Sequence, residues 1–189
     1  MRVMSNQLLL GPLAAEQFAD LPEPTDGSQQ ELVRGKVFVR PPPGGYHGAV
    51  CSRIVRRLST WIEDRELGIL TSNDSGVLLE RDPDTVRAPD IAFFSKEQLP
   101  NFPRTGYPAV PPDLAIEVLS PSDVFLRMLG KVEMYLRVGV RLVWDIVPED
   151  NGVSVHVPDA PVRVLTADDL LDGGTVLPGF TCPVRQLFP

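Results

Sequence analysis

The stretch PPDLAIEVLSPSD, residues 111–123, decides how the fold is interpreted, because it places a glutamate inside an apolar run. The run LAIEVL, residues 114–119, is bounded by Pro-Pro and Ser-Pro-Ser, which predicts a short strand buried on both faces. An unpaired carboxylate in such a strand would cost several kcal/mol, since a buried charge needs a partner. Glu117 therefore predicts a nearby cation, whose role is either structural or catalytic.

A lysine on the next predicted helix is the nearest credible partner. This helix is expected over about residues 123–138, closed by Gly139, and the short connection before it makes helix and strand packed neighbours. One stripe of the helix should face the sheet: Val124, Met128, Lys131, Tyr135 and Val138. Three roles stay open for Lys131: half of a buried ion pair with Glu117, a lysine reaching the sheet edge, or a point charge that orients a water or phosphate oxygen.

A second carboxylate, Asp90, opens another predicted strand in the run RAPDIAFF. Two carboxylates that meet at one end of a sheet form a hard-oxygen site for Mg²⁺ or Mn²⁺, although a turn or cap role for Asp90 is also open. Asp113 also follows a proline, but four residues of strand separate it from Glu117 by about 13 Å. We therefore expect Asp90 to approach Glu117 within about 6 Å, close enough to share a cation.

Two more regions carry candidate site residues. Glu31 opens the first predicted strand and is either a third carboxylate of the site or a solvated strand-end acid. His47 begins a helix predicted over residues 47–66 and is either a nucleic-acid-binding residue or, as the alternative, a cap or a satisfied core histidine. The polar face of this helix carries three arginines that either contact a phosphate backbone or are simply solvated: Arg53, Arg56 and Arg57.

Helices interleaved with short strands predict one domain over residues 1–189, with a mixed α/β or α+β sheet. An N-terminal hairpin should turn at Arg34-Gly35. In the terminal meander we expect His156 to face solvent, followed by a helical turn that begins at Thr166. The remaining strands are expected at 69–71, 77–81, 86–94, 141–147, 153–157 and 162–165.

Composition limits the classes of function. The 189 residues are 43% hydrophobic and 23% charged, which is typical of a soluble globular protein. No apolar stretch approaches the ~20 residues that a membrane span needs, and two cysteines, Cys51 and Cys182, suit the reducing cytoplasm. The net charge of −7 argues against non-specific coating of DNA. A homodimer that aligns two sites is therefore expected for any DNA-directed activity.

The order carboxylate, Pro-Asp, Glu and Lys resembles the PD-(D/E)XK nuclease superfamily. More closely, the chain resembles the Uma-two family of bacterial restriction-endonuclease-like proteins. The resemblance implies a restriction-endonuclease-like core flanked by helices, with an N-terminal hairpin and a C-terminal β meander. The matching stretches cover about residues 29–189 in family order: QELVRGKVFVRPPPGGYHGAV, TVRAPDIAFF, PPDLAIEVLSPSD, KVEMYLRVGVRLVWDIVPE and LPGFTCPVRQLF.

The resemblance also implies roles for individual residues. Asp90 and Glu117 would bind Mg²⁺ or Mn²⁺, with the carbonyl of Val118 as a further ligand. The superfamily's lysine two residues after the glutamate is Leu119 here, and its role maps onto Lys131 on the following helix.

In the same family pattern, Glu31 matches the first acidic position and His47 a frequent histidine. The implied activity is metal-dependent endonucleolytic hydrolysis of DNA. The alternative is a catalytically inactive nucleic-acid- or protein-binding module on the same fold.

Overall fold

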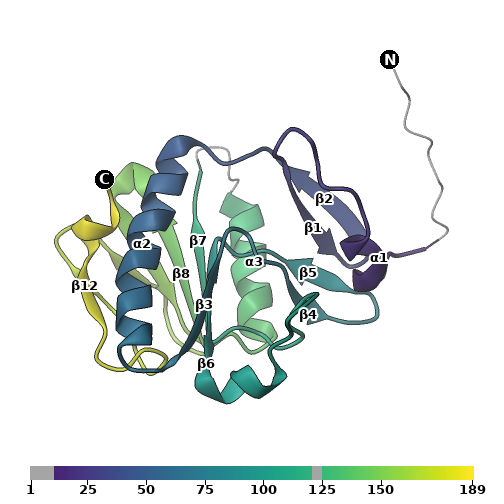
Figure 1. Cartoon of the computed structure of the whole chain (residues 1–189). Helices are drawn as coiled ribbons and strands as arrows, with labels where there is room; N and C mark the ends of the chain where they lie inside the picture. Colours follow the sequence, from purple (N-terminus) through teal and green to yellow (C-terminus); the bar gives the residue numbers. More distant parts are fainter. Residues whose placement is uncertain (1–10, 121–124) are drawn as a thin grey trace.

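A computed structural model describes residues 11–120 and 125–189. Its centre is a six-stranded sheet in the order β10-β9-β8-β7-β6-β3 (Figure 1). β7 and β8 pair in parallel and the other neighbours are antiparallel, so the predicted mixed sheet is confirmed. The bounds are β3 (Gly68–Ser72), β6 (Ile91–Ser95), β7 (Leu114–Val118), β8 (Leu142–Val147), β9 (Gly152–His156) and β10 (Arg163–Leu165).

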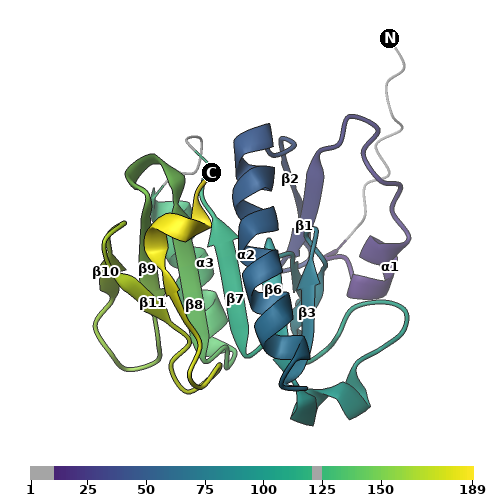
Figure 2. The same cartoon turned by 60° about the vertical axis from the view of Figure 1, so that its left-hand side comes forward.

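The sheet is covered by a helix on each face (Figures 1 and 2). α2 (Gly45–Glu63) buries a stripe with four-residue spacing against one face: Val50, Ile54, Leu58 and Ile62. α3 (Phe125–Arg137) packs on the other face through Val132 and Tyr135. Because both faces are covered, every residue of β7 is buried, as its apolar pattern predicted.

The predicted helical stripe of α3 agrees with the structure where the two can be compared. Lys131 and Tyr135 are buried, and Val138 is partly buried against the apolar cluster to which Tyr135 belongs. Val124 and the side chain of Met128 lie outside the part of the chain that the structure describes.

A smaller sheet stands beside the central one, in the order β2-β1-β5-β4. The predicted hairpin is confirmed: Arg34 and Gly35 turn the chain with φ of 49° and 73°, both in the left-handed region that a two-residue turn of type I′ requires. The bounds are β1 (Gln29–Val33), β2 (Lys36–Arg40), β4 (Val77–Glu80) and β5 (Thr85–Arg87).

The single strand predicted over 86–94 is two strands, because the chain changes sheets at Pro89. β5 pairs with β1 and β4 in the smaller sheet, whereas β6 enters the central sheet. Proline has no N–H to donate to a ladder, so pairing stops there. This change of sheet brings Asp90 to the junction between the two sheets.

The C-terminal region corrects two predictions. Residues 166–173 do not begin a helix: the Asp169 carboxylate accepts bonds from the N–H and hydroxyl of Thr166, and β11 (Leu170–Asp172) then pairs with β12 (Thr181–Pro183). This strand pairing buries Leu171 completely in the core. His156 does not face solvent. It is 7% exposed and its Nε2 lies 2.9 Å from Oδ2 of Asp145.

The remaining helices are short: α1 (Ala15–Ala19) and the 3₁₀ turns Lys96–Asn101, Pro148–Asp150 and Val184–Leu187. Within residues 11–120 and 125–189, no helix combines the length and apolar character needed to cross a bilayer.

Two glycine substitutions test the packing. Gly68 has φ +154° and pairs with Ser95, and an added Cβ would lie 2.0 Å from the carbonyl oxygen of Phe94. Backbone cannot move aside cheaply, so Gly68→Ala should lower the free energy of unfolding by about 1–3 kcal/mol. Gly48→Ala, inside α2 with open space around it, should instead raise it by about 0.5–1 kcal/mol. Urea unfolding measures both, and equal effects would contradict this packing.

Candidate active site

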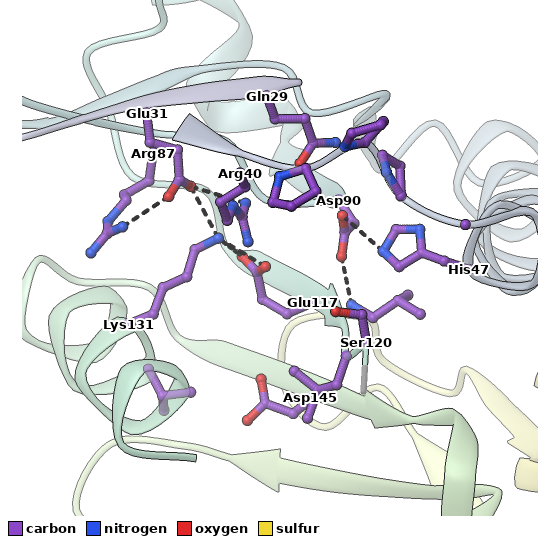
Figure 3. A pocket seen from close by; sticks show the side chains of 17 residues that line it. Gln29, Glu31, Arg40, His47, Arg87, Asp90, Glu117, Ser120, Lys131 and Asp145 are labelled. Atoms are coloured by element: carbon purple, nitrogen blue, oxygen red, sulfur yellow. Dashed lines mark hydrogen bonds and ion pairs between the residues drawn. The ribbon is translucent and has the colours of Figure 1, made fainter. Parts of the chain in front are cut away.

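Asp90 and Glu117 reach one cavity from neighbouring strands. β6 and β7 pair in antiparallel register through Ile91 and Ile116, so Asp90 and Glu117 are the next residues outward and share a face. Both line a cavity of about 320 Å³, which Val118 also lines (Figure 3). The sheet therefore brings together the two carboxylates that the sequence singled out.

Asp90 is held by two donors. One carboxylate oxygen accepts the Val118 N–H at 2.6 Å, and the other lies 3.3 Å from Nε2 of His47. Burial acts to raise the pKa of Asp90, but the hydrogen bonds from His47 and Val118 outweigh it and lower the pKa. The same bond to Asp90, with a contact to Cys51, raises the pKa of His47 to about 10. The imidazole is therefore cationic at neutral pH.

Glu117 is paired with α3. Lys131 Nζ lies 2.8 Å from its carboxylate, and the Tyr135 hydroxyl donates to Oε1 at 2.8 Å. The two donors lie four residues apart and so share a helix face. Burial raises the pKa of Glu117 to about 7, because Lys131 offsets it only in part and the charges of Asp90 and Glu31 add to it. Lys131 is thus the cation that the β7 sequence required.

Glu31, on β1 of the smaller sheet, also contacts the ammonium of Lys131. Its carboxylate lies 3.1 Å from Lys131 Nζ and 2.9 Å from Nη1 of Arg87, and it accepts the Ala88 N–H at 3.1 Å. Burial acts to raise the pKa of Glu31, but Lys131, Arg40 and Arg87 lower it to about 2. Burial likewise acts to lower the pKa of Lys131, and the charges of Glu117 and Glu31 raise it instead. Glu31 therefore anchors the lysine ammonium.

Comparison with known proteins identifies the family and the fold of this chain. The sequence model of the Uma2 family, described as "Putative restriction endonuclease", matches residues 15–185. The chain belongs to the Uma2 family. The family resemblance inferred from the sequence motifs is thereby confirmed.

A crystal structure described as a putative nuclease belonging to DUF820, from Anabaena variabilis ATCC 29413, is similar to this Uma2 chain. The TM-score is 0.79 with 24% sequence identity, covering 94% of this chain and 98% of that one. At this identity the similarity shows the fold, which is nuclease-like. A search of curated proteins gave no match.

Several cavity residues of this Uma2 protein had no signal in its sequence. Arg40 and Arg87 contact Glu31 from β2 and β5. Asp145, fully buried, lines the same cavity from β8. Asp74 lines a second cavity rather than this one and receives a hydrogen bond from the Gln29 amide; burial and the neighbouring Asp90 raise its pKa to about 6.

The three arginines predicted to contact nucleic acid are not among the residues that line this cavity. Arg53 and Arg56 are exposed on α2. Arg57 donates to the Arg53 carbonyl and to the side chain of Gln186, each at 3.3 Å. His47, proposed with them, lies instead inside the cavity beside Asp90.

The donor set fits a hard cation of the Mg²⁺ type. Asp90 and Glu117 supply carboxylate oxygens, and each carboxylate has about four lone-pair positions, more than its present donors use. Burial and crowding by other acids raise the pKa of Glu117, which indicates negative charge that a dication would relieve. Among the described residues, no three His, Cys, Asp or Glu side chains are arranged around one ion position. Mg²⁺ takes one or two carboxylates and completes its shell with water and phosphate oxygens, so Asp90 and Glu117 would be a sufficient pair of protein ligands.

The pKa of His47 predicts a pH-dependent stability. A raised folded-state pKa means that its stabilisation is complete below pH 6.5 and is lost as the pH rises to about 10. The wild-type free energy of unfolding should fall across this window by up to about 1.4 kcal/mol per pH unit from this group. His47→Gln keeps a donor for Asp90 but does not titrate. The difference in the free energy of unfolding between wild type and His47→Gln should therefore shrink as the pH rises. Parallel curves from urea melts at several pH values would contradict the His47–Asp90 ion pair.

Proposed function

We propose that this protein is a metal-dependent endonuclease that hydrolyses phosphodiester bonds of DNA, with Mg²⁺ or Mn²⁺ as the cofactor. The observation that carries the proposal is the meeting of Asp90 and Glu117 at one cavity, with the ammonium of Lys131 fixed beside them. Membership of the restriction-endonuclease-like Uma2 family supports the same reaction class.

Asp90, Glu117 and the carbonyl of Val118 would hold the ion. When bound, it would polarise the scissile phosphate and lower the pKa of a bound water. His47 is a positioning residue in this scheme, because its bond to one carboxylate oxygen fixes the orientation of Asp90. The Val118 N–H on the other oxygen completes that restraint.

Lys131 would stabilise the negative charge that develops on the phosphoryl oxygens. A cation fixed before the reaction needs no reorganisation when that charge appears. Glu31 and Tyr135 support this role, since Glu31 contacts the ammonium and Tyr135 donates to its partner Glu117.

The competing function is a catalytically inactive module that binds nucleic acid or protein. One observation favours it: the Lys131 ammonium contacts two carboxylates, Glu117 and Glu31, as in a purely structural ion pair. In either function we propose a homodimer, because the net charge of −7 leaves a single 20.8 kDa chain poorly suited to hold duplex DNA.

Metal binding can be tested without activity. Mn²⁺ at a hundredfold excess over its Kd should stabilise the protein by about 2.7 kcal/mol, seen as a rise in Tm. Asp90→Asn should abolish the rise. Asp159→Asn removes the same charge from an exposed turn residue with φ 56°, a conformation that Asn also tolerates, and should retain it. An equal rise in all three proteins would remove Asp90 from the metal site.

Lys131→Met separates the catalytic role from the structural one. Methionine keeps length and apolar packing, so with Mn²⁺ present the free energy of unfolding should stay within about 1.5 kcal/mol of wild type. Without Mn²⁺ it should drop by about 3–5 kcal/mol, because Glu117 loses its buried partner. Cleavage of single-stranded, duplex and branched DNA should fall at least about a hundredfold.

The matched control is Lys96→Met, at an exposed lysine paired with exposed Glu66, which should change neither quantity. Normal cleavage by Lys131→Met would remove that lysine from the mechanism. Absence of cleavage by the wild type on all three DNAs would favour the binding module.

A further inference from the structure

The segment that runs from β2 into α2 carries two exposed aromatic side chains. Phe38 and Tyr46 are each 52% exposed. Among the described residues, the other exposed large apolar side chains are aliphatic. Exposed aromatic rings are enriched where proteins contact ligands or partners.

Phe38 lies on the face of β2 that carries side chains into the catalytic cavity. Phe38 pairs with Glu31 and Arg40 pairs with Gln29, and directly opposed residues of antiparallel strands point to the same face. Glu31 and Arg40 both line the cavity. Lys36, two residues before Phe38 and exposed, shares that face. The order along this face is therefore cation, aromatic ring, cation.

β2 ends its sheet, so its outer edge has no neighbouring strand among the described residues. Arg40 at the end of β2 and residues 41–44 after it line the cavity, and the chain then enters α2, whose first turn holds Tyr46 and His47. In Figure 1 this connection crosses the upper side of the molecule, where β7 ends. The two exposed rings thus lie, along the chain, on either side of residues 40–44, which form one wall of the cavity.

We propose that Lys36, Phe38, Arg40 and Tyr46, here called the aromatic track, bind a single-stranded segment of nucleic acid. Bases would stack on the two rings while the cations lie near the phosphates, which is how single strands are held without a sequence preference. A duplex offers no free base faces to these rings, because its bases are stacked on one another. The inference rests on the proposed nuclease function and specifies the form of its substrate.

Charge favours the same occupant. The chain as a whole carries −7, so the electrostatic attraction that drives non-specific duplex binding is weak. Stacking supplies affinity that does not depend on net charge. A protein partner on the same edge strand would use Phe38 differently, as a buried contact between chains.

The test measures binding apart from cleavage. Fluorescence anisotropy, without divalent metal, follows a labelled oligo(dT) of about 12 nucleotides, near the upper range of such sites, and a hairpin duplex with the same number of phosphates. Phe38→Ala and Tyr46→Ala should each weaken oligo(dT) binding about 5- to 100-fold. Lys36→Gln should reduce the salt slope, d log K/d log[salt], by about 0.7. The duplex should bind more weakly than oligo(dT) and respond little to the aromatic substitutions.

Val39→Ala is the matched control. Val39 is 59% exposed on the same strand but points to the opposite face, so oligo(dT) affinity should not change. Equal loss in Val39→Ala and Phe38→Ala, or no loss in Phe38→Ala, overturns the aromatic track. Conversion of a dimer into a monomer by Phe38→Ala, seen by light scattering, overturns it in favour of a protein interface.

The outcomes remain separate from the nuclease proposal. Wild-type cleavage with Mn²⁺ together with unchanged oligo(dT) affinity in Phe38→Ala would overturn the track alone. Selective loss of oligo(dT) binding, in a protein that cleaves no DNA, would support the track and overturn the nuclease.

Discussion

The buried carboxylate of Glu117 is the constraint on which the rest of the site depends. Glu117 lies on the most buried strand of the sheet, so it requires donors from the helix that covers it. Lys131 and Tyr135 supply them from one face of α3, which fixes the rotation of that helix against the sheet. Lys131 in turn carries a buried positive charge, and Glu31 from the hairpin balances it. The carboxylate in the central strand thereby determines how both α3 and the smaller sheet are held.

The junction of the two sheets makes the cavity. β5 ends in the smaller sheet and β6 begins in the central one, with Pro89 between them, so Asp90 lies where both sheets meet. Glu31 reaches the same place because β1 pairs with β5 through Leu32 and Val86. Residues distant in sequence are thus brought together by two strand pairings and one helix contact. Glu31, Glu117 and Lys131 leave strands or a helix, and Asp90 directly precedes β6 and is held by the Val118 N–H, so regular elements position the site.

The sequence was informative where local pattern determines contact. The pairing of Glu117 with Lys131 follows from a buried strand, a short connection and a helical stripe. The contact of Glu31 with Lys131 could not be predicted, because it depends on how β1 pairs with β5, a long-range choice that no local pattern encodes. His156 alternates with valines, which identifies its face but not whether that face is covered. At residues 166–173, a Thr-x-x-Asp pattern suits a helix start and a tight turn equally, and burial of Leu171 decided for the strand.

Under the proposed function, an acidic protein must admit a polyanion, and the charges around the cavity bear on how it would do so. Its lining holds four acidic side chains, Glu31, Asp90, Glu117 and Asp145, and four basic ones, Arg40, His47, Arg87 and Lys131. Burial and the neighbouring carboxylates raise the pKa of Glu117 to about 7, so the acids are crowded and a bound dication would relieve that crowding. Under the proposed function, a phosphate would then enter a cavity whose negative charge the ion has reduced. By linkage, the ion and the phosphodiester should each strengthen the binding of the other.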